Sequence, residues 1–265
     1  MNFRTLSPFG VEADGVSITD LQDADIVTTR DALANNGFIV FRNQSASDAD
    51  FVAFLARLGK LTFTIGEIPV SHQPDLNIVS NVGRTRPPRS VFHTDTSYVS
   101  SPPAFTGLRA VAIPTPDGGT FFFSDQYRAY DTLPSSVKAR LADAQVLHLV
   151  SGLILDPDVE SQCWHPLFKR HPISGRLALF LSTPERCQEI SGIPSEDARR
   201  MIRLLYKHSI RHHRLYCHQW QPNDILVWDN RCTLHRADRA QFVGDWNTSA
   251  LRDRVLHRGL VLDLV

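Results

Sequence analysis

Short runs of apolar residues, each bounded by turn-forming residues, dominate the hydrophobic pattern of this chain. The run Phe38-Ile39-Val40-Phe41 follows Asn36-Gly37, and the run Ile225-Leu226-Val227-Trp228 follows Gln221-Pro222-Asn223-Asp224. Runs of this length that are apolar on both faces are typical of buried strands. The same pattern predicts further strands over 76–80, 105–113, 120–123, 146–150, 177–181 and 252–262.

Helical periodicity is confined to a few segments. Residues 23–35 alternate at helical spacing and end at Asn36-Gly37, which is a C-terminal capping signal. Ser47 caps a second predicted helix, which carries an apolar stripe and ends at Gly59. Two more helices are predicted, one from about Leu133 to Ala142 and one that begins at Ser195.

Many short strands with few helices favour a sandwich or barrel of sheets over a βαβ fold. No G-x-G-x-x-G follows a predicted strand, and neither a P-loop nor a G-x-S-x-G motif occurs, so the dinucleotide, P-loop and esterase interpretations lack support. The 265 residues contain no repeat or linker, and we therefore expect residues 1–265 to form a single domain of mixed α and β structure.

The stretch 91–98 is the first candidate for chemistry, because it places His93 and Asp95 two residues apart among β-branched and aromatic residues. Such a run predicts a strand, in which residues i and i+2 point to the same face. An imidazole and a carboxylate so placed supply two corners of the two-histidine, one-carboxylate triad that holds Fe(II) and leaves positions open. Taken alone, the short motif is more often a polar surface strand than a metal site.

Composition excludes several classes of partner. Lys plus Arg and Asp plus Glu each total 28, so the formal net charge is zero, and neither nucleic acid nor an anionic membrane is indicated. No apolar segment is long enough to span a bilayer, and no secretory h-region follows Met1, so we expect a cytoplasmic protein. The four cysteines show no C-x-x-C spacing and are predicted to be free thiols.

Three loops and clusters have both a functional and a plain interpretation. The loop from Asn81 to Arg89 carries three arginines just before His93; these are either solvated charges or substrate contacts at the rim of the cavity. Residues 153–172 have no clear period and are predicted to be a long loop, a lid or a substrate-binding element. The group His212, His213, Cys217 and His218 matches no structural zinc pattern and is better explained by a strand with partly exposed histidines.

His235 and Arg258 could complete the site that His93 and Asp95 begin, as a second imidazole and a cation. His235 lies at the end of another predicted strand, and Arg258 lies on the last one. Fe(II) bound by two imidazoles and one carboxylate has room for a bidentate oxoacid and O₂. A dicarboxylic cosubstrate also needs a cation for its far carboxylate, and arginine offers an always-charged bidentate fork. In isolation, a satisfied buried histidine and a solvated strand arginine are the better explanations.

At these residues the sequence closely resembles the taurine dioxygenase family of Fe(II)- and 2-oxoglutarate-dependent oxygenases. The resemblance covers about Asp23 to Leu262 and rests on four motifs in the same order. They are Phe92-His93-Thr94-Asp95 with Pro102-Pro103; Gly118-Gly119-Thr120 followed by Ala129-Tyr130-Asp131-Thr132-Leu133-Pro134; His171-Pro172-Ile173-Ser174-Gly175; and Trp220-Gln221-Pro222-Asn223-Asp224 through Trp228-Asp229-Asn230-Arg231 to His235 and Arg254-Val255-Leu256-His257-Arg258.

The resemblance implies a distorted double-stranded β-helix, a cupin-like jelly roll flanked by helices. It implies that His93, Asp95 and His235 bind Fe(II). It further implies that Arg258, helped by Thr120, binds the far carboxylate of 2-oxoglutarate, and that Arg254 faces the anionic group of the substrate. The implied reaction consumes 2-oxoglutarate and O₂, releases succinate and CO₂, and oxidises a C–H bond of a small-molecule substrate. Because Asp95 is present, hydroxylation, desaturation or ring formation is implied rather than halogenation.

Departures from the family pattern bear on the substrate. Phe92 stands where the family often has tryptophan, and Thr120 follows Gly119 directly, which reverses its face in a strand relative to the usual spacing. The region 61–64 lacks the histidines of taurine-specific members, and Arg89 replaces their asparagine. Taurine is therefore not the expected substrate. Arg89 and Arg254, with Asn81 in the same loop as Arg89, indicate a small anion or a polar acid.

Two other functions use the same residues. A zinc-dependent hydrolase or isomerase would leave Arg258 and the four motifs unexplained, and a non-catalytic jelly-roll binding module would have little need of all three ligands and the arginine. A specialised biosynthetic role fits the same pocket. The expected partner is a small molecule, with neither nucleic acid nor membrane, and self-association into a homo-oligomer is left open.

Overall fold

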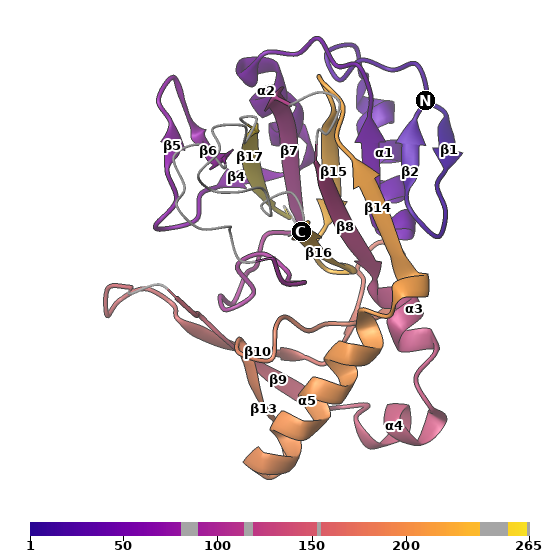
Figure 1. Cartoon of the computed structure of the whole chain (residues 1–265), viewed down its shortest axis with the longest axis vertical. Coiled ribbons are helices and arrows are strands. Elements are labelled where there is room, and N and C mark those ends of the chain that lie inside the picture. The colour runs from indigo at the N-terminus through magenta and orange to yellow at the C-terminus, as the bar shows by residue number, and fades with distance from the viewer. Residues whose placement is uncertain (81–89, 114–118, 153–154, 239–253, 264–265) are drawn as a thin grey trace, which may run out of the picture.

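The computed structural model describes residues 1–80, 90–113, 119–152, 155–238 and 254–263. Its largest element is a nine-stranded sheet in the order β1-β2-β3-β15-β7-β17-β6-β5, with β4 also paired to β17 (Figure 1). The strands are β1 (Phe3–Thr5), β2 (Val11–Ala13), β3 (Phe38–Phe41), β4 (Lys60–Thr62), β5 (Pro69–Val70), β6 (Gln73–Ser80), β7 (Phe105–Ala112), β15 (Ile225–Asp229) and β17 (Val255–Leu262).

A second, three-stranded sheet lies against one face of the first. It has the order β14-β8-β16 and consists of β14 (Leu215–Gln219), β8 (Thr120–Asp125) and β16 (Thr233–Ala237). Aromatic side chains join the two sheets, because the ring of Phe38 stacks on that of Phe123 at 4.7 Å and Phe123 also meets Trp228. Two sheets that share such a core confirm the predicted jelly roll flanked by helices.

Two helices cover the other face of the large sheet, α1 (Asp23–Asn36) and α2 (Asp48–Leu58). Ser47 caps α2 as predicted, with its side chain accepting a hydrogen bond from the Asp50 backbone. The helix can approach closely because Gly107 and Gly259 are paired in neighbouring strands. A Cβ atom at Gly259 would lie only 2.3 Å from Leu55 Cδ1.

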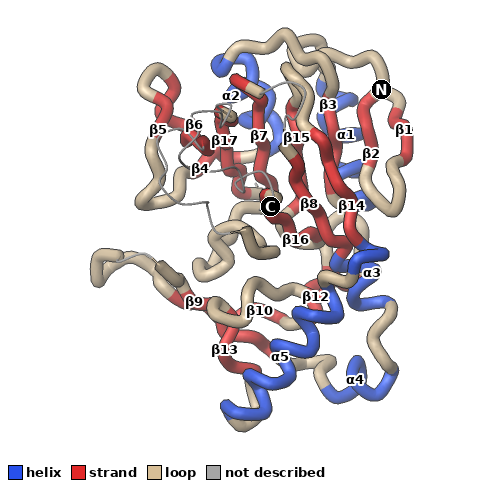
Figure 2. Tube along the Cα trace, in the orientation of Figure 1, coloured by secondary structure: helices blue, strands red, loops and turns tan. Residues whose placement is uncertain are grey.

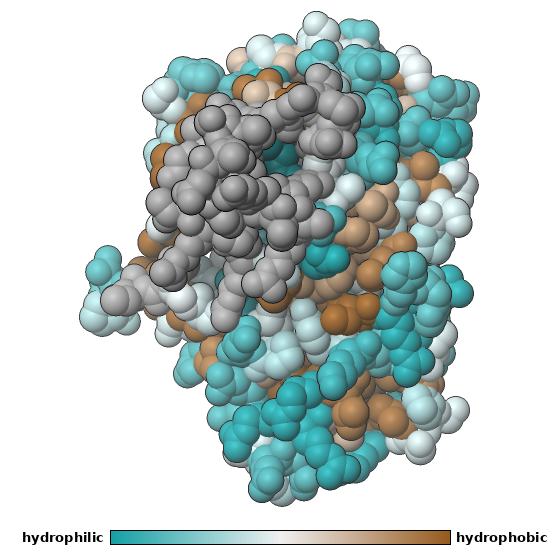
Figure 3. All heavy atoms as spheres, viewed as in Figure 1, coloured by the Kyte–Doolittle hydropathy of each residue, from teal (hydrophilic) through white to brown (hydrophobic). Residues whose placement is uncertain are grey.

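The remaining elements form a smaller layer beside the jelly roll, seen in the lower part of Figures 1 and 2. They pack around their own apolar core, which includes Leu167, Leu181 and Ile202. Hydrophilic side chains cover much of this part of the surface, where α5 lies (Figure 3). The elements are α3 (Gln126–Asp131), α4 (Ser135–Arg140), β9 (Gln145–Leu149), β10 (Gln162–Pro166), β11 (Phe168–Arg170), β12 (Leu177–Leu179), β13 (Cys187–Ile190), α5 (Ser195–Ser209) and a 3₁₀ turn (His212–Arg214).

The structure corrects three local predictions. Residues 91–98 do not form a strand; His93 makes an isolated bridge and a turn follows. The segment 153–172 is not one long loop, because β10 and β11 lie within it and pair with β9 and β12. His218 is fully buried rather than partly exposed, since its strand lies in the small sheet and its side chain meets Trp220.

The cysteines and the lengths of the helices bear on two further predictions. The four cysteines are free, as predicted. Among the described residues, no helix is both long and apolar enough to cross a membrane.

Candidate metal centre

His93, Asp95 and His235 meet between the two sheets, and one ligand atom from each lies within 4.8 Å of the others. His235 belongs to β16, while His93 and Asp95 come from the segment that precedes β7. The Nε2 atoms of both histidines lie 3.7 Å from Asp95 Oδ1. The three residues therefore present two imidazole nitrogens and one carboxylate oxygen to a common point, which is the donor set of a facial triad.

Backbone pairing, rather than a strand, brings the histidines together. The His93 amide donates to the His235 carbonyl at 3.0 Å, and the His235 amide donates to the His93 carbonyl at 2.9 Å. Tyr206 from α5 donates its hydroxyl to the carbonyl of Phe92 at 2.9 Å. After Asp95 the chain turns at Thr96, whose φ is 44°. The bridge fixes the ring of His93 next to that of His235, with centroids 4.4 Å apart.

The protonation states of the three groups suit a divalent metal. Burial lowers the pKa of His235 to about 3, against the opposing effect of Asp95, and burial also lowers the pKa of His93. Burial works against ionisation of Asp95, yet His235, Arg258 and His93 together lower its pKa to about 2. At neutral pH the site thus offers neutral imidazoles and a carboxylate, the forms in which these groups bind metal.

The second nitrogens of the two histidines differ. His93 Nδ1 hydrogen-bonds to the Val91 carbonyl at 2.9 Å, which fixes the proton on Nδ1 and leaves Nε2 as the acceptor. His235 Nδ1 is buried and has no partner among the described residues. The ring of His235 is instead held by aromatic contacts, stacked on Phe121 at 5.5 Å and tilted against Trp228 at 4.5 Å.

A chain of hydrogen bonds orients the Asp95 carboxylate. Thr106 on β7 donates to Asp95 Oδ2 at 2.8 Å, and Asn230 donates in turn to the Thr106 hydroxyl at 2.8 Å. Trp228 Nε1 fixes the Asn230 amide by donating to its oxygen at 3.0 Å. No sequence pattern predicted a role in the site for Thr106 or Asn230. Only the motif Trp228-Asp229-Asn230-Arg231 pointed to this part of the chain.

Replacing Thr106 with valine tests this support. The side chain keeps its shape but loses the hydrogen bond to Asp95, so the affinity for Fe(II) or Mn(II) is expected to fall by about 10- to 100-fold, the usual cost of losing an outer partner of a metal ligand. Titration calorimetry with Mn(II) measures the change. Thr29→Val is the matched control, because Thr29 is also fully buried but bonds only within α1. Equal Mn(II) affinity in both variants would contradict the support role.

Arg258 reaches the same centre from β17. Its Nη1 atom lies 3.7 Å from Asp95 Oδ1, its Nε donates to Asn77 Oδ1 at 3.1 Å and its Nη2 donates to Glu67 Oε1 at 2.9 Å. The next residue, His257, points to the opposite face, where its Nδ1 pairs with Asp48 of α2 at 2.8 Å. Arg258 is therefore a cation at the edge of the metal centre, as the sequence predicted in general terms.

The other predicted site residues lie in different places. Arg254 immediately precedes β17; it is buried, and burial lowers its pKa. Thr120 begins β8, and its hydroxyl donates to Asp238 Oδ2 at 2.8 Å. Asn81 and Arg89 fall outside the described residues.

The described residues line two cavities, and one of them includes residues that neighbour the metal ligands in sequence. One, of about 130 Å³, is lined by Thr96 and Tyr98, which follow Asp95, by Leu260, two residues beyond Arg258, and by Phe63 and Ile65. Many of the side chains that line this cavity are apolar.

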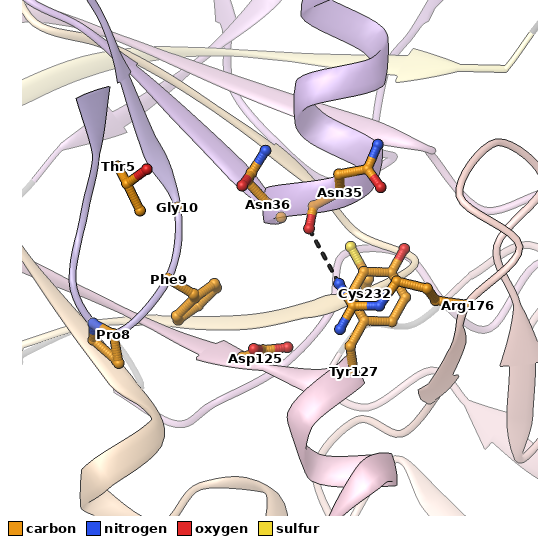
Figure 4. A pocket seen from close by; sticks show the side chains of 11 residues that line it. Thr5, Pro8, Phe9, Gly10, Asn35, Asn36, Asp125, Tyr127, Arg176 and Cys232 are labelled. Atoms are coloured by element: carbon orange, nitrogen blue, oxygen red, sulfur yellow. Dashed lines mark hydrogen bonds between the residues drawn. The ribbon is translucent and has the colours of Figure 1, made fainter. Parts of the chain in front are cut away.

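The other cavity, of about 210 Å³, lies where the N-terminal segment meets α1 and α3 (Figure 4). There the guanidinium of Arg176 lies over the ring of Tyr127 at 4.0 Å and donates to the Asn35 carbonyl at 3.2 Å. The described residues that line it include none of the three proposed metal ligands.

Comparison with known proteins agrees with this geometry. The model of the taurine catabolism dioxygenase TauD, TfdA family matches residues 2–260. The α-ketoglutarate-dependent 2,4-dichlorophenoxyacetate dioxygenase of Cupriavidus pinatubonensis is 29% identical over 285 residues, covering 95% of this chain and 94% of the relative. The (S)-phenoxypropionate/α-ketoglutarate dioxygenase of Sphingobium herbicidovorans is 28% identical and covers 86% of both chains.

A solved structure shows the same fold. The crystal structure of a taurine dioxygenase from Burkholderia xenovorans superposes with a TM-score of 0.84 at 27% identity, covering 100% of this chain and 91% of the other. Together with the buried His93, Asp95 and His235 cluster, these matches imply Fe(II), 2-oxoglutarate and O₂ as the cofactor and cosubstrates. The chain belongs to the TauD, TfdA family and is an α-ketoglutarate-dependent dioxygenase.

Proposed function

We propose that this dioxygenase, acting as one domain, hydroxylates an unactivated C–H bond of a small anionic organic substrate and releases succinate and CO₂. The observation that carries the proposal is the position of Arg258, whose guanidinium lies 3.7 Å from Asp95 Oδ1. A cation there can hold the anionic group of a substrate beside the metal. Desaturation or ring formation would use the same residues and differs only in where the substrate's carbon atoms lie.

His93, Asp95 and His235 would hold Fe(II) through one face of its coordination sphere. When bound, the iron supplies the oxidising chemistry together with 2-oxoglutarate and O₂. The residues of this chain orient the metal ligands and exclude water from the site. Thr106 and Asn230 fix the Asp95 carboxylate, and aromatic side chains from both sheets pack around the histidine ring and exclude water.

Arg254, just before β17, and Arg258, on β17, would bind the two anionic groups of the reaction. Arg254 and Arg258 are four residues apart, roughly 13 Å of extended chain. Arg258 lies at the metal centre. The reacting part of the substrate must approach the metal, whereas the far carboxylate of 2-oxoglutarate lies three carbon atoms beyond the atoms that chelate it. We therefore assign the cosubstrate carboxylate to Arg254 and the substrate anion to Arg258. This exchanges the roles that the sequence suggested.

Kinetics of the two single variants decide between these assignments. Arg254→Gln is expected to raise the KM for 2-oxoglutarate by about 10- to 100-fold, and Arg258→Gln to raise the KM for the substrate by a similar factor, because each loses a charge-assisted hydrogen bond. Succinate formation measures both constants. If Arg258→Gln instead raises the KM for 2-oxoglutarate and leaves the KM for the substrate unchanged, Arg258 binds 2-oxoglutarate, as the sequence resemblance implied.

A substrate screen tests the proposed function as a whole. The named relatives act on aryloxy acids, so phenoxyacetates head the screen, followed by other carboxylates, sulfonates and phosphonates, with taurine among them. The expected result is succinate release that a carboxylate stimulates, with a product heavier by one oxygen atom or, for a phenoxyacetate, the phenol and glyoxylate into which the hydroxylated hemiacetal splits. Stimulation only by uncharged compounds would contradict an anionic substrate. A product lighter by two hydrogen atoms would indicate desaturation or ring formation.

A further inference from the structure

The guanidinium of Arg258 already holds a carboxylate that belongs to the chain itself. Glu67 Oε1 accepts a hydrogen bond from Arg258 Nη2 at 2.9 Å. The two partners differ in exposure, because 14% of the Arg258 side chain is exposed against 39% of that of Glu67. A pair with one solvent-exposed partner is weakly stabilising. Glu67 can therefore leave the arginine for water at little cost, whereas the arginine is fixed in the site.

Asn77 adds an unused donor to the same place. Asn77 on β6 lies opposite Arg258 in the strand register, and its Oδ1 accepts from Arg258 Nε at 3.1 Å. Because that oxygen faces a donor, Nδ2 is the other end of the amide. Asn77 is 1% exposed, and its Nδ2 has no hydrogen-bond partner among the described residues. A buried donor without a partner is costly, so an incoming acceptor would satisfy it.

The segment that carries Glu67 also forms part of the cavity wall. It joins β4 to β5, and it contributes Phe63, Thr64 and Ile65 to the cavity of about 130 Å³. Leu260, two residues beyond Arg258 on β17, lines the same cavity. The carboxylate of Glu67 and the apolar wall thus belong to one short segment at the edge of the metal centre.

We propose that Arg258 and Asn77 form a carboxylate-binding site in which Glu67 is an internal, displaceable occupant. An incoming carboxylate cannot share the site, since Glu67 and Asp95 would both repel it. It must replace Glu67, and it then gains the Asn77 Nδ2 donor that Glu67 leaves unused. Glu67 and Asn77 are in this way specificity-determining residues, which favour carboxylates able to fill the adjoining cavity. The inference rests on the proposed function only for the identity of the incoming carboxylate.

Chemical modification of Arg258 tests the proposal without turnover. The protein is loaded with Mn(II), and the rate at which phenylglyoxal modifies Arg258 is followed by peptide mass spectrometry with increasing phenoxyacetate. Glu67→Gln is expected to speed the modification, and to lower the concentration of phenoxyacetate that protects Arg258 by about fivefold, the effect of losing a weak competing ion pair. Glu189→Gln, an exposed glutamate on β13, is the matched control and should behave as the parent.

Three outcomes would overturn the proposal. They are an unchanged modification rate in Glu67→Gln, a lack of protection by phenoxyacetate in that variant, and equal protection by the neutral phenoxyacetamide. The double variant Glu67→Gln, Asn77→Leu tests the Asn77 amide, because leucine has a similar shape and removes Nδ2 without adding a negative charge beside Arg258. In this variant phenoxyacetate should no longer protect Arg258. Protection equal to that in Glu67→Gln would show that Asn77 does not bind the carboxylate.

A parallel titration with 2-oxoglutarate separates the two sources of a carboxylate. If Glu67→Gln lowers the protecting concentration of phenoxyacetate and not that of 2-oxoglutarate, Glu67 competes with the carboxylate of the substrate. If it shifts only protection by 2-oxoglutarate, the internal occupant is supported but Arg258 serves the cosubstrate, and the assignment of arginines in the proposed function fails instead.

Discussion

Asp95→Ala is expected to abolish turnover, because it removes the one carboxylate of the proposed metal centre. Asp95 is 5% exposed, and its Oδ1 lies 3.7 Å from the Nε2 atoms of both His93 and His235. Loss of an outer partner such as Thr106 already costs metal sites about 10- to 100-fold in affinity, and loss of a ligand must cost more. We therefore expect Fe(II) affinity to fall by more than about 100-fold and succinate formation to disappear.

Anaerobic addition of Fe(II) and 2-oxoglutarate measures this effect directly. The parent protein should show the weak visible charge-transfer band of the chelate, and Asp95→Ala should not. Asp31→Ala is the control, since Asp31 is an exposed carboxylate on α1. A band of equal strength in Asp95→Ala, with unchanged Fe(II) binding, would contradict the proposed triad.

The three proposed metal ligands were identified correctly as a cluster, although the reason given for two of them was wrong. His93 and Asp95 were expected to share the face of a strand, but their segment is a bridge followed by a turn. They meet because His93 pairs with the backbone of His235 and because Thr106 on β7 holds the Asp95 carboxylate. A motif of two residues encodes their identity, whereas the pairing that positions them depends on a strand distant in sequence.

Residues that act through neighbours were harder to find. Thr106 and Asn77 are uncharged residues inside predicted strands, and a strand pattern says nothing about which distant side chain each will face. Their roles follow from register, because β6 places Asn77 opposite Arg258. Glu67 lies in a segment with no periodicity at all. By contrast, α1, α2 and β3 were predicted well, since their caps and apolar patterns are local.

Asp229→Asn is expected to produce the largest loss of stability among the changes considered. Asp229 is fully buried at the end of β15. Its carboxylate accepts hydrogen bonds from Arg231 Nη2 at 2.6 Å and pairs with His171 Nε2 at 2.9 Å. Arg231 also forms an ion pair with Asp263, so the network joins the turn after β15 to the end of β17. After the substitution Arg231 keeps only the less buried Asp263 as an anionic partner, and removing one charge of a buried pair typically costs about 3–5 kcal/mol.

Thermal and urea unfolding measure this cost. For a chain of this size, such a loss corresponds to a fall in Tm of roughly 10 °C. Arg42 and Asp224 supply a comparison, because their pair also has one fully buried carboxylate but a more exposed arginine. Asp224→Asn is therefore expected to cost less than Asp229→Asn, since the arginine that it leaves without this partner is better solvated. If the two variants unfold alike, burial of the Asp229 pair is not what stabilises this turn.

The dependence of this difference on pH supplies an independent check of its electrostatic origin. Burial opposes ionisation of Asp229, but Arg231 and His171 outweigh it and hold the pKa of the carboxyl well below its usual range. A carboxyl whose pKa is depressed on folding stabilises the native state above its unfolded pKa of about 3.9, and this contribution is lost as the pH falls below that value. The gap in unfolding free energy between the parent and Asp229→Asn should thus be constant near neutral pH and narrow below about pH 4. A gap that did not change with pH would mean that the substitution costs stability through packing, and not through the loss of a buried charge.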